Sequence, residues 1–220
     1  MSSRDSQRLL VAASGVLGSL LLVVYFGAPL LAAPLATVVY AANPSTQQVV
    51  DVGRRYHDLL FVGTWFQATG ALLSVVFFLG LVQMARATTR LAGTLVIMGA
   101  AVLLGVVVAE GVFTLTWATA AAAGEQGSAR ASFDLMASFI RVFPIVPAPV
   151  VYLAVGAALL GSGVLPRPFA PLAVGLGASF ELVGLAGVLT PAAGTAAAAL
   201  SGLQDLWVLA AAVALLARRV

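Results

Sequence analysis

The chain has 220 residues, of which 61% are hydrophobic and only 9% are charged, and its formal net charge is +3 at pH 7. A soluble domain carries about 25% charged residues, so this composition excludes a water-soluble globule of the same size. Cysteine and lysine are absent and there is one histidine, which excludes thiolate or histidine-rich metal sites, Schiff-base lysines and P-loops. We therefore expect no metal, no cofactor and no nucleic-acid partner.

The first apolar run covers residues 9–33 and follows two arginines, Arg4 and Arg8. About 20 apolar residues span a bilayer as a helix, whereas a signal peptide has an apolar region of only about 7–15 residues. The length of the run therefore favours a retained transmembrane helix over a cleaved signal peptide. Pro29 and Pro34 are expected to mark its end.

Five further spans complete an all-α membrane bundle. They are predicted at 59–84, 91–117, 144–161, 168–190 and 198–217. The result is a single membrane domain over residues 1–220, with six transmembrane helices in three hairpins. Asn43 and Pro44 indicate the start of an external helix over 44–58, with Asn as N-cap and Pro at the first helical position.

Three prolines interrupt the fourth span: Pro144, Pro147 and Pro149. Each removes one helical hydrogen bond, and Pro147 would free the carbonyl of Phe143. Broken helices at membrane depth often line a binding cavity. Alternatively, residues 132–143 form an amphipathic helix on the membrane surface, with Arg141 on its polar face, and the prolines form a connector. The sequence leaves both interpretations open.

The arginines indicate the orientation of the bundle. One side is expected to hold Arg4, Arg8, Arg86, Arg90, Arg167, Arg218 and Arg219, and the other Arg54, Arg55, Arg130 and Arg141. Cytoplasmic loops carry the excess of basic residues, so both termini are predicted to be cytoplasmic. The composition suggests a bacterial origin, and hence the inner membrane.

Two carboxylic acids are predicted at similar membrane depth on consecutive antiparallel helices. Glu181 lies roughly 21 Å above Arg167, and Asp205 lies roughly 20 Å above Arg218, at 1.5 Å per residue. If their side chains meet, the pair could bind a proton, a cation or a cationic solute. The alternative is structural, with one acid hydrogen-bonded to a backbone carbonyl and the other reaching water.

Three more polar residues are expected near the outer side of the membrane. Glu110, Gln67 and Arg141 each lie roughly 27–30 Å from the inner end of their helix. Glu110 either pairs with Arg141 or lies in the headgroup layer beside Trp117. Together with Glu181 and Asp205, these residues predict a polar region that opens outward.

Small residues recur at four-residue spacing and predict close helix packing. The pairs are Ser14 and Gly18, Gly15 and Ser19, Gly70 and Ser74, and Gly175 and Ser179. Such faces let helix backbones approach closely in lipid. Packing within the bundle is favoured over a dimer interface.

The six-helix plan, the lone acid in Ala109-Glu110-Gly111 and the turn from Leu165 to Leu172 resemble a family of small bacterial membrane proteins known as a domain of unknown function. The resemblance covers most of the chain. It implies a six-helix bundle and no known activity.

These patterns favour a membrane protein that binds or passes a small solute, ion or lipid through an outward-facing polar cavity. A second hypothesis is a non-catalytic interaction or assembly subunit, with a second copy or another membrane protein as partner. An intramembrane enzyme comes third, because no set of nucleophile, base and orienting residue is visible.

Overall fold

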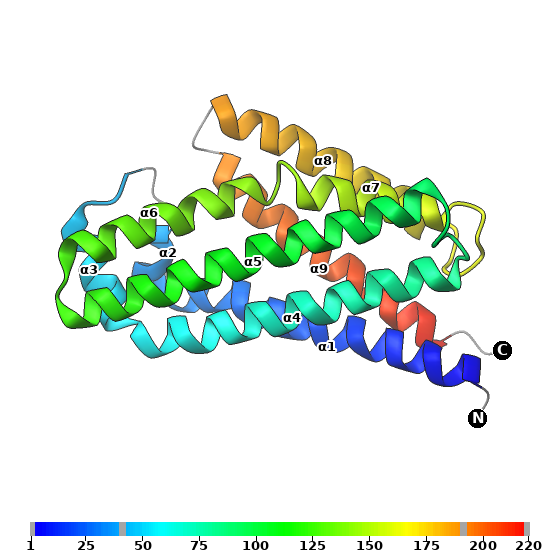
Figure 1. Cartoon of the computed structure of the whole chain (residues 1–220), viewed down its shortest axis with the longest axis horizontal. Coiled ribbons are helices and arrows are strands. Elements are labelled where there is room, and N and C mark those ends of the chain that lie inside the picture. The colour runs from blue at the N-terminus through cyan, green and yellow to red at the C-terminus, as the bar shows by residue number, and fades with distance from the viewer. Residues whose placement is uncertain (1–2, 40–42, 190–192, 218–220) are drawn as a thin grey trace.

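The predicted all-α architecture is confirmed by the computed structural model, which describes residues 3–39, 43–189 and 193–217. Nine helices and no strands occur within these ranges. The helices are α1 (Ser3–Leu31), α2 (Ala33–Val39), α3 (Thr46–Arg55), α4 (His57–Met84), α5 (Leu91–Ala123), α6 (Gln126–Val142), α7 (Pro147–Leu159), α8 (Phe169–Leu189) and α9 (Ala193–Ala217). The long helices run roughly lengthwise through the molecule, and α1 begins at the end of the molecule where α9 ends (Figure 1).

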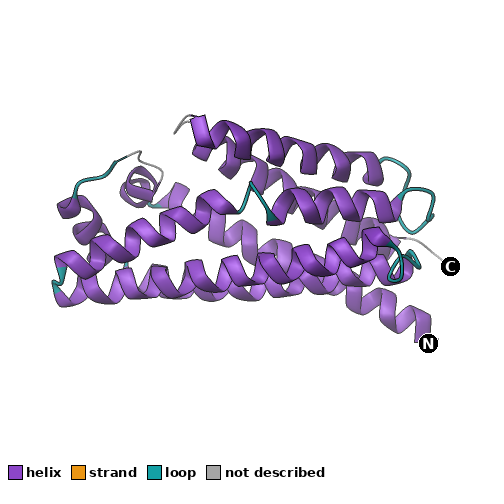
Figure 2. Ribbon diagram, turned by 45° about the horizontal axis from the view of Figure 1, so that its top comes forward, coloured by secondary structure: helices purple, strands orange, loops and turns teal. Residues whose placement is uncertain are grey.

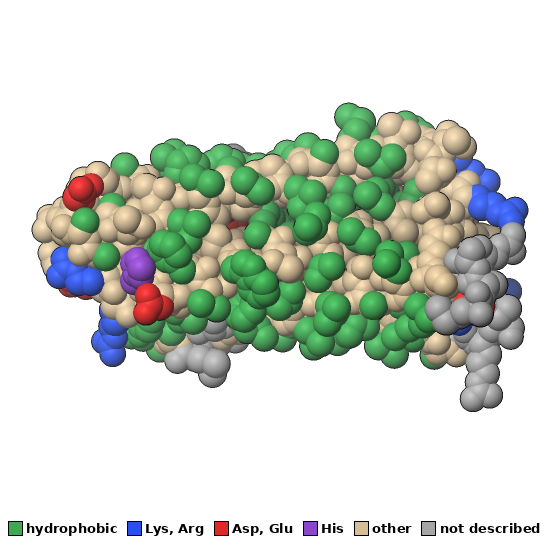
Figure 3. Space-filling view, turned by 60° about the horizontal axis from the view of Figure 1, so that its bottom comes forward, with side chains coloured by type: hydrophobic (Ala, Val, Ile, Leu, Met, Phe, Trp, Pro, Cys, Tyr) green, Lys and Arg blue, Asp and Glu red, His purple; other side chains and the backbone are tan. Residues whose placement is uncertain are grey.

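Six segments of the described chain are long and apolar enough to cross a membrane. They are Asp5–Gly27, His57–Met84, Leu91–Ala123, Gln126–Leu159, Phe169–Gly187 and Ala199–Ala217. On the face shown in Figure 3, hydrophobic side chains cover the middle of the molecule, while charged side chains gather at its two ends. This distribution is that of a multi-pass membrane protein, since charged groups are costly within the hydrocarbon layer.

The six spans form a closed ring. Each packs against the next in the order α1, α4, α5, α7, α8 and α9, and α9 packs against α1 again. Figures 1 and 2 show the helices from two sides. A ring of six helices leaves a central space that side chains must fill or leave hollow.

Small residues bring α1 and α4 into close contact, as their spacing predicts. A methyl group placed on Gly18 would lie 3.0 Å from the backbone oxygen of Gly70, and one placed on Gly80 would lie 2.3 Å from Val11. Gly175 of α8 differs, because a methyl group placed on it would have no atom within 4 Å. The small-residue faces of α1 and α4 are thus used inside the bundle, whereas that of α8 is not.

Aromatic side chains fill the ring in the half nearer the chain termini. Phe78, Phe180 and Trp207 surround Tyr152, with ring centroids 5.5, 6.2 and 5.7 Å from its own. All four side chains are buried. This half of the bundle is therefore closed by packed rings.

The other end of the molecule carries a second apolar core, which we call the cap. It consists of α2, α3, α6 and the C-terminal part of α5. Trp117 of α5 is fully buried there, and its indole N–H donates to the carbonyl of Val49 at 3.0 Å. Arg130 of α6 binds the carboxylate of Asp134 at 2.9 Å and donates to the carbonyl of Pro44. Trp117 was expected to be an interface residue, and the structure shows it enclosed by the cap rather than exposed at the molecular surface.

The helix predicted over residues 44–58, between the first two spans, is present as α3, but it starts later than expected. Ser45, and not Asn43, is the N-cap of α3. The Ser45 side chain accepts from the backbone N–H of Gln48, whose side chain accepts in turn from the backbone N–H of Ser45. This reciprocal capping box stabilises a helix start more completely than an Asn-Pro pair, and it sets the boundary.

The fourth span is broken, as predicted, but neither interpretation of the break holds in full. α6 lies lengthwise along α5, with Phe133 and Met136 buried, so it does not lie flat on a membrane surface. None of the three prolines lines the central cavity described below. Pro147 starts α7, and the carbonyl of Phe143 accepts from the N–H of Ala148 at 3.2 Å instead of remaining free. The prolines therefore join two helices of one span.

Candidate functional site

A cavity of about 150 Å³ occupies the centre of the ring, between the aromatic core and the cap. An engineered cavity of similar volume in another protein takes up a benzene-sized molecule. Its lining is largely apolar. Among the described residues, the lining side chains that carry a hydroxyl, amide or carboxyl group are those of Tyr25, Gln67, Ser74, Glu110, Thr114, Tyr152, Ser201, Gln204 and Asp205. A mostly apolar cavity with a few convergent polar groups is the usual form of a small-molecule site.

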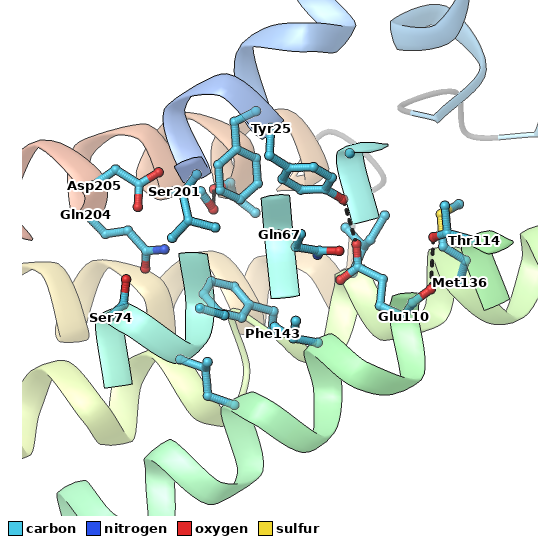
Figure 4. A pocket seen from close by; sticks show the side chains of 18 of the residues that line it. Tyr25, Gln67, Ser74, Glu110, Thr114, Met136, Phe143, Ser201, Gln204 and Asp205 are labelled. Carbon is cyan, nitrogen blue, oxygen red and sulfur yellow. Dashed lines mark hydrogen bonds between the residues drawn. The ribbon is translucent and has the colours of Figure 1, made fainter. Parts of the chain in front are cut away.

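Glu110 of α5 lies at one end of this polar set. It is 6% exposed, and its Oε1 accepts a hydrogen bond of 3.1 Å from the hydroxyl of Tyr25 on α1. The amide of Gln67 on α4 points toward the same carboxyl group (Figure 4). Three separate spans thus converge on one acid, so its position is fixed by the bundle rather than by one helix.

Asp205 of α9 lies at the other end, with Ser74, Ser201 and Gln204 around it (Figure 4). It is 2% exposed, and its Oδ2 has no hydrogen-bond partner among the described residues. The hydroxyl of Ser74 has none either, whereas that of Ser201 donates to the carbonyl of Ala197 at 3.0 Å. Buried polar groups are normally paired, so unpaired atoms in two residues that line one cavity indicate a place for a bound molecule or water.

The two ends are separated by about 10 Å along α4. Gln67 lies at the Glu110 end and Ser74 at the Asp205 end, seven residues apart on one helix, and each residue adds about 1.5 Å. The wall between them is apolar and includes Leu22, Ala71 and Val107. The cavity is therefore elongated, with an acid at each end and an apolar middle.

No arginine or histidine lines the cavity among the described residues. In sequence, the segments 40–42 and 190–192 contain no basic residue either. The ion pairs of His57 with Asp58 and of Arg130 with Asp134 both lie in the cap or at its edge. Neither acid of the cavity is thus neutralised by a cation of the described protein.

The structure brings three of the five predicted site residues together and leaves two outside. Glu110, Gln67 and Asp205 line the cavity. Glu181 is an exposed residue of α8, and Arg141 is an exposed residue near the end of α6. The hypothesis of a Glu181–Asp205 pair is not supported, because Asp205 faces the interior of the ring and Glu181 does not. The Glu110–Arg141 ion pair is not observed either, since Glu110 is bound by Tyr25.

Several residues of the site were not found from the sequence. Tyr25 is an ordinary aromatic in a long apolar run, and Ser201 and Gln204 are uncharged residues in an alanine-rich helix. One signal was present: Ser201, Gln204 and Asp205 recur at three- and four-residue intervals and share one face of α9. That face is the one α9 presents to the cavity.

No family model matches the chain, and no curated protein or solved structure matches it. The resemblance to a family of small bacterial membrane proteins therefore depends on the sequence features alone.

Proposed function

We propose that this membrane protein binds a small solute or ion in its central cavity, which opens toward the cap side of the membrane. The single observation that carries the proposal is the placement of two buried acids, from different spans, on one cavity whose described lining contains no basic residue. Burying a carboxyl group without a partner costs several kcal/mol of folding free energy. An empty cavity returns none of this free energy to the fold.

The packing supports access from the cap side. On the side of the chain termini, the aromatic residues around Tyr152 close the ring. On the cap side the cavity is bordered by aliphatic side chains, Leu35 and Val39 of α2 and Leu59 of α4, and we place its opening there. With the termini in the cytoplasm, as the arginines indicate, this state is outward-facing. Passage of a solute to the inside would require the aromatic residues around Tyr152 to repack.

A cavity-filling variant tests the proposal. A methyl group on Gly63 would lie 3.6 Å from the Tyr25 ring, which is ordinary contact, so Gly63→Leu should extend into the cavity without a backbone clash. Gly105→Leu is the matched control, because Gly105 is exposed and has nothing within 4 Å. Thermal unfolding in detergent would be measured with a panel of small amines, carboxylates, alcohols and alkali cations.

We expect at least one class to stabilise the wild type and Gly105→Leu but not Gly63→Leu. A ligand at a hundred times its Kd stabilises the folded state by about 2.7 kcal/mol, which is readily measured. If every class shifts the unfolding of Gly63→Leu and of the control equally, the cavity is not a binding site and the proposal is wrong.

A membrane interaction subunit is the second candidate, and one observation favours it. Glu181 lies twelve residues beyond the start of α8, about 18 Å into the span, yet it is exposed on a face with Leu182 and Leu185. A charged group facing lipid at this depth costs roughly 3 kcal/mol, and a partner helix would remove that cost. In mild detergent, the wild type should then purify as a larger complex that Glu181→Leu loses.

A further inference from the structure

The two ends of the cavity identify the chemical class of its ligand. An acid lies at each end, and the wall between them is apolar. We infer that the ligand is a linear aliphatic diamine, with one ammonium group at Glu110, the other at Asp205, and a hydrocarbon chain along Leu22 and Ala71. This inference rests on the proposed function and names the solute that the cavity takes.

Charge complementarity is the first reason. The described lining contains two acids and no base, and a bound dication would neutralise both. Charge-assisted hydrogen bonds between ammonium and carboxylate groups are about twice as strong as neutral ones. The free Oδ2 of Asp205 and the free hydroxyl of Ser74 are acceptors for the three donors of an ammonium group.

The spacing is the second reason. One inorganic cation has ligands within about 2.6 Å, so it cannot contact two ends that are about 10 Å apart. No cluster of three His, Cys, Asp or Glu side chains suited to a metal is found in the part of the chain that the structure describes. With a hydrogen bond of about 2.8 Å at each end, the two nitrogens of a bridging ligand must lie roughly 5–10 Å apart. The five-carbon diamine cadaverine meets this requirement, whereas the two-carbon ethylenediamine is too short.

The aromatic walls are the third reason. The ring of Tyr25 lies at the Glu110 end of the cavity. Tyr152, whose ring contacts that of Phe78, borders the cavity on the side of the chain termini. Aromatic faces attract ammonium groups when water is excluded, and their apolar edges pack against methylene groups. An anionic solute would find no cationic side chain in the described lining and would be repelled by the two acids.

Binding of three probes of equal length tests the inference. Cadaverine has two ammonium groups, pentylamine has one and pentanediol has none. Affinities would be measured by isothermal titration calorimetry with the detergent-solubilised full chain. We expect cadaverine to bind at least tenfold more tightly than pentylamine, and pentanediol to bind most weakly, because each lost ammonium group removes one charge-assisted contact.

The acid variants assign the two ends. Glu110→Gln and Asp205→Asn keep the shape of the side chain, and each should reduce the affinity for cadaverine to about that for pentylamine in the wild type. Glu181→Gln is the matched control, since it removes an acid of the membrane region that does not line the cavity. It should leave all three affinities unchanged, and thermal unfolding of each variant would verify that it is folded.

Two results would overturn the inference. Equal affinity for cadaverine and pentanediol would show that charge at both ends is not recognised, as would cadaverine binding that both acid variants retain. The proposed function is judged separately: another solute class that binds the wild type but not Gly63→Leu would leave it intact while excluding the diamine. Binding of none of the classes in that panel would contradict both.

Discussion

Asp205 is held in the interior of the bundle at a cost that the described protein does not compensate. Its Oδ2 is buried without a partner, and no basic side chain of the described lining faces it. Function accounts for such a residue better than stability does, since active and binding sites retain groups that destabilise the unliganded fold.

Asp205→Asn should therefore raise the free energy of unfolding of the unliganded protein by about 1 kcal/mol, because the amide avoids the free-energy cost of burying a carboxyl group that has an unpaired oxygen. The measurement is the thermal unfolding midpoint in detergent without added ligand. Glu125→Gln, an exposed acid of the cap, should change the midpoint little. A large loss of stability in Asp205→Asn would show instead that the carboxyl group is held by a structural partner.

Trp117 shows how one side chain joins the cap. Its indole N–H donates to Val49 of α3, and its ring lies edge-on to Phe133 of α6 at 5.1 Å. Trp117→Phe retains an aromatic ring but leaves the buried carbonyl of Val49 without this donor. We expect a loss of about 1–3 kcal/mol in the free energy of unfolding.

Trp65→Phe is the control for that change, because Trp65 is 59% exposed and its indole makes no hydrogen bond within the described part of the chain. Its unfolding midpoint should stay within the experimental error of the wild type. If both variants unfold alike, the bond between Trp117 and Val49 contributes nothing to the cap.

At the scale of elements, the contact between α1 and α4 positions both Tyr25 and Gln67 at the cavity. A methyl group on Gly80 would meet the side chain of the buried Val11, so Gly80→Ala must push the two helices apart. We expect a loss of about 1–3 kcal/mol, the usual cost of overpacking.

Gly105→Ala provides the opposite expectation for the same chemical change. Gly105 lies within α5 on an open surface, so the added methyl group should stabilise the helix by about 0.5–1 kcal/mol. Thermal unfolding of the two variants side by side makes the comparison. Equal effects would mean that the close approach at Gly80 does not constrain the bundle.

The extent to which the sequence predicts each element follows from the strength of its local signal. Long uncharged runs define the spans, because a bilayer requires about 20 apolar residues whatever surrounds them. The cap was harder to predict, since α2, α3 and α6 are short or only moderately apolar and are buried by contacts between distant residues such as Val49 and Trp117.

The candidate site was predicted in part for a related reason. Helical rise gives the depth of a residue along its span, and depth alone predicted a shared polar region for Glu110, Gln67 and Asp205. All three line the cavity. Depth does not give the direction in which a side chain points. Glu181 has nearly the expected depth but faces away from the centre of the ring. Because α8 is apolar around nearly its whole circumference, its sequence does not indicate which face is turned inward.

At the scale of the whole molecule, the ring of six spans requires both chain ends to lie on one side of the membrane. Reporter fusions after Arg90 and at the C-terminus should both be cytoplasmic, and a fusion near Glu125 should be external. Alkaline phosphatase and green fluorescent protein fusions would give opposite signals at each position. A cytoplasmic signal at Glu125 would reverse the direction in which the cavity opens.

The most direct test of an acidic cavity open to the outside uses one cysteine at Ser201. The natural chain contains no cysteine, so Ser201→Cys introduces a unique thiol of similar size beside Asp205. Its rate of modification by membrane-impermeant thiosulfonates, one cationic and one anionic, would be measured in intact cells and in inverted vesicles. Modification should occur only from the outside and at least tenfold faster with the cationic reagent, and this preference should be lost in the Glu110→Gln, Asp205→Asn background. A thiol that is unreactive from outside, or that reacts equally fast with both reagents, would contradict an outward-open acidic cavity.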